Sequence, residues 1–144
     1  MNVTDVNQAE ILSILNNSES EAIKTFTNNL LERPEFSSLT VLENRTGLAM
    51  LPAVDSTQGT TFHLGEVLLS VARVKLGKSE GYNACLGRDL EQALAIAILD
   101  AALAEGIERE KILEFVAVQK SMLEARDHIL LAQVESTRVQ METF

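Results

Sequence analysis

Residues 62–106 of this chain read FHLGEVLLSVARVKLGKSEGYNACLGRDLEQALAIAILDAALAEG, and this stretch decides the fold. In its first half, residues 73–76 alternate between charged and apolar side chains, and glycines separate segments rich in Val, Leu and Ala. This pattern is typical of antiparallel strands. We therefore predict strands over residues 62–76 and 81–86, with a hairpin loop at residues 77–81 between them.

The second half of the stretch predicts a helix. Asp89 and Gln92 have capping-box spacing, in which a side chain at each end satisfies a free backbone N–H at the start of a helix. Gly106 can end the same helix, because glycine readily adopts the left-handed conformation that closes many helices. Between these ends, residues 93–104 are apolar around nearly the whole circumference, which for so short a helix indicates burial within protein. We expect this central helix to lie on the sheet.

The strand pattern continues upstream of this stretch. Residues 48–54 form a further predicted strand, although Pro52 has no N–H for the hydrogen-bond ladder and indicates an edge strand or a bulge. Residues 67–69 are apolar on both faces, so we expect that part of the second strand to be covered on two sides.

Helices are predicted at the N-terminal end of the chain. Capping-box spacing occurs at Asp5 with Gln8 and again at Ser18 with Glu21, which predicts two helices. The second of them should stop before Pro34, because proline cannot continue a helix.

A helical tail is predicted over residues 107–144, which contain no Gly or Pro and carry apolar residues at helical spacing. The tail could form one long helix. We favour two helices, because Ser121 and Glu124 again have capping-box spacing after a polar pair.

These predictions together describe an α+β fold in a single domain, residues 1–144, a length suited to one core. An antiparallel sheet of three to four strands, residues 39–87, packs against the central buried helix, residues 89–106. N-terminal helices in residues 1–33 and the C-terminal helical tail flank this centre.

Composition narrows the class of function. The formal net charge of -9 disfavours binding to nucleic acid or to an anionic membrane, because both depend on concentrated Lys and Arg. The single cysteine, Cys85, excludes an internal disulfide and any multi-cysteine zinc site. We see no secretory signal in the first ten residues and no apolar run of the roughly 20 residues that a bilayer needs. We therefore expect a cytoplasmic protein.

Two motifs resemble functional sites, a phosphate-binding loop and a metal site, but other features of the sequence argue against both. Residues 77–79 read Gly-Lys-Ser, like the end of a phosphate-binding loop, but that motif needs a glycine where Ala72 stands and must lead into a helix. A strand is predicted to follow here, so we interpret the triplet as a hairpin loop. His63 and Glu66 are close in sequence, but no second histidine follows at ligand spacing, so we expect a solvent-facing histidine and no metal site.

Charged positions on and before the central helix have two interpretations each. Asp100 is the lone charge in an apolar stretch, and a carboxylate buried without a partner is costly. We favour a structural ion pair with Arg73, Arg88 or a partner chain over a role in substrate binding.

Arg88 and Asp89 stand where free N–H groups and the helix dipole can bind an anion. Because Asp89 can cap those N–H groups itself, we favour capping and keep phosphate recognition by Arg88 as the alternative.

The same residues resemble a known family. Five segments match, in order and spacing, the G subunit of the bacterial carbon-phosphorus lyase system, the PhnG family: RTGLAML at 45–51, FHLGEVL at 62–68, ARVKL at 72–76, GYNACLGRD at 81–89 and AIAILDAAL at 95–103. STRV at 136–139 is a weaker match near the end. The resemblance covers residues 39–103 well and the two ends loosely.

The resemblance implies a subunit of a complex with the H, I and J proteins of that system, assisted by an L protein. In that system the I protein, supported by G, H and L, joins a phosphonate such as methylphosphonate to the ribose of MgATP. Adenine leaves, and a ribose 1-phosphonate 5-triphosphate results. The iron-sulfur, radical-using J protein later breaks the carbon-phosphorus bond. The implied role is a non-catalytic or site-supporting subunit with no cofactor of its own, in a complex that uses MgATP.

The family-like positions are candidates for ligand or interface contacts, and we assign no catalytic and no metal-binding residue. They are Arg45, Thr46, Gly65, Glu66, Tyr82, Arg88, Asp89 and Asp100. The chain departs from the family at Ser70 and Val71, where the family tends to have Thr-Arg. It departs again at residues 140–144, QMETF, where the family tends to have paired phenylalanines and a basic end.

Two other functions fit the residues. The chain could be a homodimeric interaction module whose apolar tail helix exchanges between copies, and we expect a homo-oligomer when it is isolated. It could instead bind or hydrolyse a phosphorylated ligand on its own, using Arg88 and the adjacent helix start.

Overall fold

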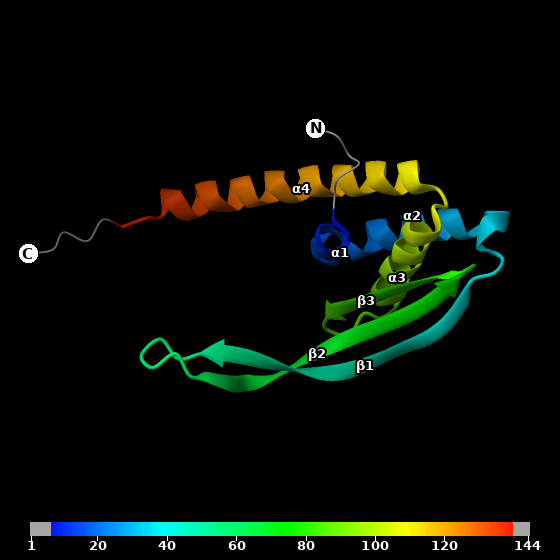
Figure 1. Cartoon of the computed structure of the whole chain (residues 1–144). Coiled ribbons are helices and arrows are strands. Elements are labelled where there is room, and N and C mark those ends of the chain that lie inside the picture. The colour runs from blue at the N-terminus through cyan, green and yellow to red at the C-terminus, as the bar shows by residue number, and fades with distance from the viewer. Residues whose placement is uncertain (1–6, 140–144) are drawn as a thin grey trace, which may run out of the picture.

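The computed structural model describes residues 7–139, and within them it contains four α-helices and a three-stranded antiparallel sheet (Figure 1). The predicted α+β fold, with the sheet packed against a central helix, is confirmed. In chain order the elements are α1 (Gln8–Asn17), α2 (Ser20–Leu31), the short 3-10 helix η2 (Pro34–Phe36), β1 (Thr40–Val54), β2 (Thr61–Leu76), β3 (Ser79–Leu86), α3 (Leu90–Glu105) and α4 (Arg109–Ser136).

The sheet has the order β1-β2-β3, so β2 is the central strand and β1 is an edge strand. β1 begins at Thr40, whereas the predicted strand began at residue 48. The first half of β1 pairs with β2, but it is polar and lacks the apolar alternation from which a strand is predicted. The pairing of the two strands shifts register between Leu51 and Pro52, as the missing N–H of proline predicted. A tight turn joins β2 to β3, in which Gly77 has a φ of 58° and Lys78 donates its N–H to the Glu105 carboxylate.

α3 lies directly on β2 and β3 and forms the centre of the core. Its start and end follow the prediction: the Asp89 side chain accepts the N–H of Gln92, and Gly106 closes the helix with a φ of 82°. The contact with β3 is so close that a Cβ on Gly81 would stand 2.1 Å from the carbonyl oxygen of Ala97. Only glycine allows this approach, because any side chain at residue 81 would displace the helix backbone.

The remaining helices cover α3 from the side away from the sheet. α1 contacts both α3 and α4, and α2 packs along α3. The Phe26 ring of α2 stacks on Phe115 of α4 with ring centroids 4.1 Å apart, and the side-chain amides of Asn16 and Asn83 hydrogen-bond to each other between α1 and β3. One cluster of buried apolar side chains joins these helices to the sheet.

Two N-terminal helices form as predicted, but their caps differ. α1 is capped by Asn7, while Asp5 lies outside the described residues. The prediction that Ser18 caps α2 is wrong, since the N-cap is Glu19. Ser18 instead follows the last turn of α1, where its hydroxyl donates to the carbonyl of Ile14 at 2.6 Å. A serine beside a helix can bond forward or backward, and spacing to a glutamate does not decide which.

α4 is one continuous helix of 28 residues, so the predicted break near Ser121 is wrong. Ser121 is exposed on the helix surface, and the sequence there offers no glycine or proline to interrupt the backbone hydrogen bonds. Serine and glutamate three residues apart also lie side by side in the middle of a helix, so this spacing does not by itself indicate a helix start. The predicted helical tail reached residue 144, and residues 140–144, where the chain departs from the family, lie outside the described residues.

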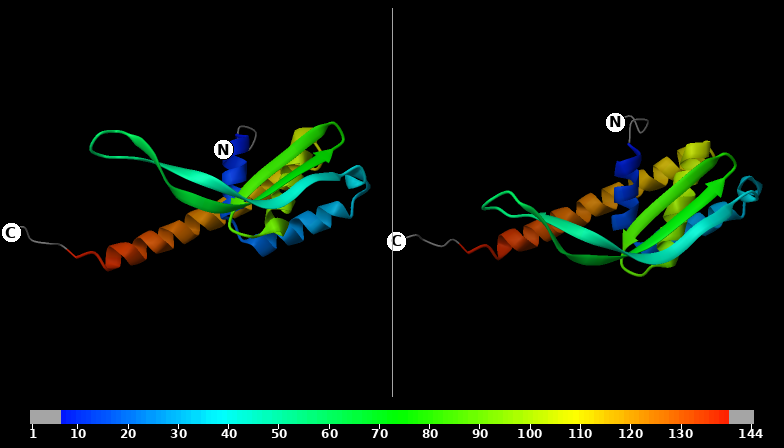
Figure 2. Two further views of the ribbon diagram at one scale, coloured as in Figure 1. Left: turned by 90° about the horizontal axis from the view of Figure 1, so that it is seen from below. Right: turned by 60° about the horizontal axis from the view of Figure 1, so that its bottom comes forward.

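Two segments extend beyond the core toward the same side in all three views of Figures 1 and 2. We call residues 46–69, the far part of the β1–β2 hairpin, the hairpin arm, and residues 120–136 of α4 the helical arm. The prediction that residues 67–69 are covered on two sides is wrong, since Leu68 is 42% exposed. No helix of the described chain is long and apolar enough to cross a membrane.

Candidate functional site

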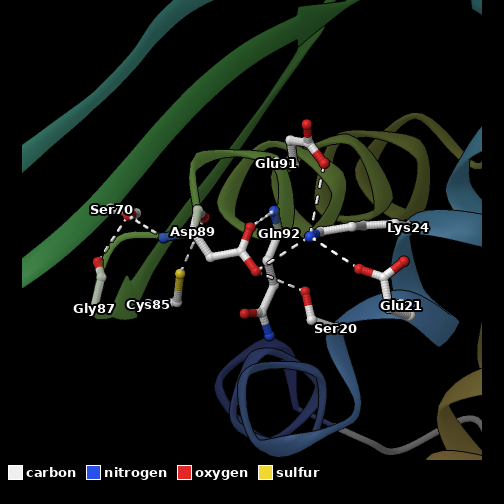
Figure 3. A network of polar contacts seen from close by, with 9 residues as sticks. All are labelled: Ser20, Glu21, Lys24, Ser70, Cys85, Gly87, Asp89, Glu91 and Gln92. Carbon is white, nitrogen blue, oxygen red and sulfur yellow. Dashed lines mark hydrogen bonds and ion pairs between the residues drawn. The ribbon is translucent and has the colours of Figure 1, made fainter.

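A network of polar contacts surrounds Asp89 at the start of α3 (Figure 3). Its carboxylate accepts hydrogen bonds from the N–H of Gln92 at 3.0 Å and from the Ser20 hydroxyl at 2.7 Å. The ammonium of Lys24 lies 3.2 Å from the same carboxylate and 3.6 Å from that of Glu91. Asp89 therefore joins α2 to the start of α3 as well as capping the helix.

Ser70 on β2 holds the short loop, residues 87–89, that joins β3 to α3. Its hydroxyl donates to the carbonyl of Gly87 at 2.8 Å and accepts the N–H of Asp89 at 2.9 Å. The side chain is fully buried in the core face of β2. Sequence reasoning missed this role, although one signal was present: Ser70 is the one polar residue in the run VLLSVA. The departure from the family at this position thus falls in a structural contact rather than on an exposed surface.

The electrostatics of the network favour capping over anion binding. Burial alone would raise the pKa of Asp89, but hydrogen bonds from Gln92, Ser20 and Lys24 outweigh it and hold that pKa below its ordinary value. The carboxylate is therefore charged near neutral pH, and it already accepts the Gln92 N–H that a phosphate at the helix start would use. Arg88 lines a shallow hollow beside it that also contains the carboxylates of Asp89 and Glu91.

Cys85 lies under this network and is buried. Burial raises the pKa of its thiol, and the nearby charge of Asp89 raises it further. A protonated thiol is a weak nucleophile, so the side chain fills space as a small apolar group.

Asp100 is 6% exposed and closes the free edge of β3. One carboxylate oxygen accepts the side-chain amide of Gln8 at 2.8 Å, and the other accepts the backbone N–H of Tyr82 at 3.0 Å. Within residues 7–139 neither Arg73 nor Arg88 forms an ion pair with it, so the predicted pair with those two residues is wrong. Two neutral donors satisfy the carboxylate instead.

The structure therefore separates the candidate residues into three places. Arg88 and Asp89 lie at the start of α3, and Tyr82 and Asp100 lie at the β3 edge. The remaining four belong to β1 and β2: Arg45, paired with Glu43 on the sheet face away from α3, and Thr46, Gly65 and Glu66 in the hairpin arm, opposite Ser70, Leu51 and Met50. All four are exposed.

Large apolar side chains are exposed on both arms. In the hairpin arm these are Leu48, Met50, Leu51, Val54, Phe62, Leu64 and Leu68. On α4 they are Val118, Met122, Ile129, Leu130, Leu131 and Val134. Many exposed large apolar side chains on the same two segments of a folded chain indicate surfaces suited to interaction with another molecule.

Charge is sparse on the hairpin arm. Apart from His63, its titratable side chains are the carboxylates of Asp55 and Glu66. Depletion of charge around exposed apolar and aromatic residues is the composition found at the centre of protein–protein interfaces. Among the described residues no group of three or more His, Cys, Asp or Glu side chains is placed to hold a metal ion.

Comparison with known proteins agrees with the resemblance seen in the sequence. The model of one protein family, described as phosphonate metabolism protein PhnG, matches residues 7–144. No curated protein matches the chain.

Proposed function

This chain belongs to the PhnG family of phosphonate metabolism proteins, and on that premise we propose that it is a site-supporting subunit of the carbon-phosphorus lyase complex. In this role it docks onto the I subunit in the cytoplasm, with the H, J and L proteins as further partners. It assists the transfer of the ribose triphosphate moiety of MgATP to a phosphonate, with release of adenine, and leaves the chemistry to its neighbour.

The exposed hairpin arm carries this proposal. A two-stranded ribbon is marginally stable in water unless a third strand or a helix covers it. The arm here has apolar side chains such as Leu48 and Leu64 on its surface, with exposed fractions of 66% and 64%. An element of this kind makes physical sense when another protein covers it.

The polar clusters support a structural rather than a reactive role. At Asp89 the carboxylate is engaged by three donors, and at Asp100 by two. Groups whose hydrogen bonds are already made within the chain stabilise the fold and are poorly placed to attack or protonate a substrate.

The proposal is tested by reconstitution. Adenine release from MgATP and methylphosphonate is measured with the I, H and L proteins, with and without this chain, and with this chain by itself. We expect release only when the chain and the I protein are both present, and we expect the two to co-purify. Sustained release by the isolated chain, or failure of the wild-type chain to bind the I protein, would contradict the proposal.

A pair of variants locates the contact. Leu48→Ser combined with Leu64→Ser should reduce co-purification with the I protein by about tenfold or more, because both side chains leave water on docking. Glu35→Ala, an exposed change in η2 on the opposite side of the molecule, serves as the matched control and should have no effect.

The helical arm favours a second behaviour in the isolated chain. Beyond Gln119, the last buried residue of α4, apolar side chains form two separate stripes, one with Met122 and Ile129 and the other with Leu130 and Val134. Helices with more than one apolar stripe associate with other helices. We therefore expect concentration-dependent self-association of the pure chain in light scattering, which the I protein should suppress.

A further inference from the structure

The two edges of the sheet are treated differently by the rest of the chain. At the β3 edge, the N–H of Tyr82 points out of the sheet and is capped by the Asp100 carboxylate at 3.0 Å. A carboxylate turned onto an edge strand satisfies it and prevents pairing with another strand. Along β1, no hydrogen bond from residues 7–139 reaches the backbone groups that face away from β2.

The direction of each β1 backbone group follows from the ladder. The N–H of Gly87 donates to the carbonyl of Leu68 at 2.9 Å, so Leu68 directs its backbone groups toward β3. Alternate residues of a central strand bond to opposite neighbours, and therefore Leu69 and Val71 direct theirs toward β1. The register pairs Leu69 with Gly47 and Val71 with Arg45.

It follows that the odd-numbered residues of this part of β1 bond to β2 and the even-numbered residues face outward. The outward residues are Asn44, Thr46, Leu48 and Met50. The same rule predicts that Tyr82, paired with Arg73, directs its N–H out of the sheet, and its bond to Asp100 agrees with that prediction.

The outward stretch of β1 lacks the features that usually block an edge. Natural edges are protected by Lys, Pro, bulges or a covering element. The register shifts of β1 fall between Val41 and Glu43 and between Leu51 and Pro52, so they bracket the stretch without entering it. The four residues whose backbone groups face outward are all uncharged, and Arg45, the one charged residue of the stretch, is paired with Glu43.

We propose that the outer edge of β1, over residues 44–50, accepts an extended strand from a partner subunit, which continues the sheet next to β1. The identity of the partner rests on the proposed function. The occupant is a strand because outward N–H and C=O groups recur at every second residue, about 6.8 Å apart, and an extended backbone matches that repeat. Its side chains are uncharged and apolar where they face Leu48 and Met50, which are 66% and 61% exposed.

Hydrogen exchange tests the proposal at the level of single amides. In the isolated chain, the amides of Thr46, Leu48 and Met50 should exchange fast, and those of Arg45, Gly47 and Ala49 more slowly. In the complex co-purified with the H, I and J proteins, the even-numbered set should become protected by about a hundredfold or more. A co-purified complex in which the even-numbered amides still exchange freely would overturn the edge proposal while leaving the proposed function intact.

Proline variants separate edge pairing from simple apolar contact. Leu48→Pro removes one outward donor and no bond to β2, whereas Leu48→Ala removes the side chain and keeps the donor. We expect Leu48→Pro to weaken partner binding about tenfold more than Leu48→Ala does. Equal losses would show that only the side chain matters and would overturn the proposal. Ala49→Pro, which removes a bond to β2, reports how far disruption of the arm itself contributes.

A second copy of this chain is the competing occupant, and it gives a different result. If the even-numbered amides become protected in the pure chain as its concentration rises, the edge is taken by self-pairing and the proposal is wrong. If the wild-type chain fails to co-purify with the companion subunits at all, the proposed function fails first.

Discussion

The two halves of β2 both carry apolar side chains, but their environments are opposite. Along residues 70–76 the side chains facing α3 are fully buried, including Ala72, Val74 and Leu76. Along residues 61–69 the same side of the strand carries Leu68, which is exposed, and Leu64 further out is exposed as well. The two halves differ in whether α3 lies on them, since the helix covers β2 only near β3 (Figure 1).

This difference teaches that a strand's own pattern does not determine its burial. Apolar residues at alternate positions show that a face can be buried, and a second layer decides whether it is. In this molecule the covered half of β2 contributes its side chains to the core, and the uncovered half leaves apolar side chains exposed. Paired substitutions in the two halves can test this comparison.

Truncation in the core should have the largest effect. Ile96→Ala in α3 removes a fully buried side chain and should lower the free energy of unfolding by about 4 kcal/mol. Leu48→Ala in the hairpin arm should change it by under about 0.5 kcal/mol, because that side chain is already in water. Urea unfolding followed by circular dichroism measures both. Equal losses would show that the isolated arm is packed in solution.

Glycine substitutions sharpen the same contrast. Gly81→Ala forces a methyl group into the α3 backbone and should destabilise the fold by about 3 kcal/mol. Gly65→Ala has no atom within 4 Å of the added carbon and should be within about 0.5 kcal/mol of wild type. Thermal unfolding of the two variants checks this, and a tolerated alanine at residue 81 would mean that α3 sits further from β3.

The next effect concerns Ser70 and Thr46, two hydroxyl-bearing residues that are register partners on β2 and β1. Ser70→Ala leaves the buried N–H of Asp89 and the carbonyl of Gly87 without their partner and should cost about 2 kcal/mol. Thr46→Ala, on the opposite residue of β1, should have little effect, because Thr46 is exposed. If chemical denaturation gave the two variants the same stability, the hydroxyl of Ser70 would have no role in holding the loop.

The smallest predicted effect on stability comes from removing the charged side chain of Asp89. Asp89→Ala removes the α3 cap and should cost about 1 kcal/mol at neutral pH. The folded state lowers the pKa of this carboxyl, so its stabilising contribution is present above the unfolded pKa and is lost as pH falls through the folded pKa. The difference between wild type and variant should therefore shrink below about pH 4. Unfolding of wild type and Asp89→Ala, measured from pH 7 to pH 3, checks this trend.

Much of the fold and part of the candidate site could be predicted from the sequence. The strand pattern, the Asp89 cap, the Gly106 end and the family resemblance all depend on residues a few positions apart. Such features are encoded locally, because backbone conformation and capping are satisfied by near neighbours. The same reasoning failed at Ser121, where one spacing fits both the start and the middle of a helix.

The tertiary structure decided which partner each group meets. Only packing showed that Ser70 holds the loop before α3 and that Asp100 meets Gln8 and the Tyr82 backbone instead of a cation. It also decided that α3 covers half of β2 and that β1 keeps an open edge. These outcomes depend on groups dozens of residues apart, and a burial or hydrogen-bond pattern in one segment carries no record of which distant segment completes it.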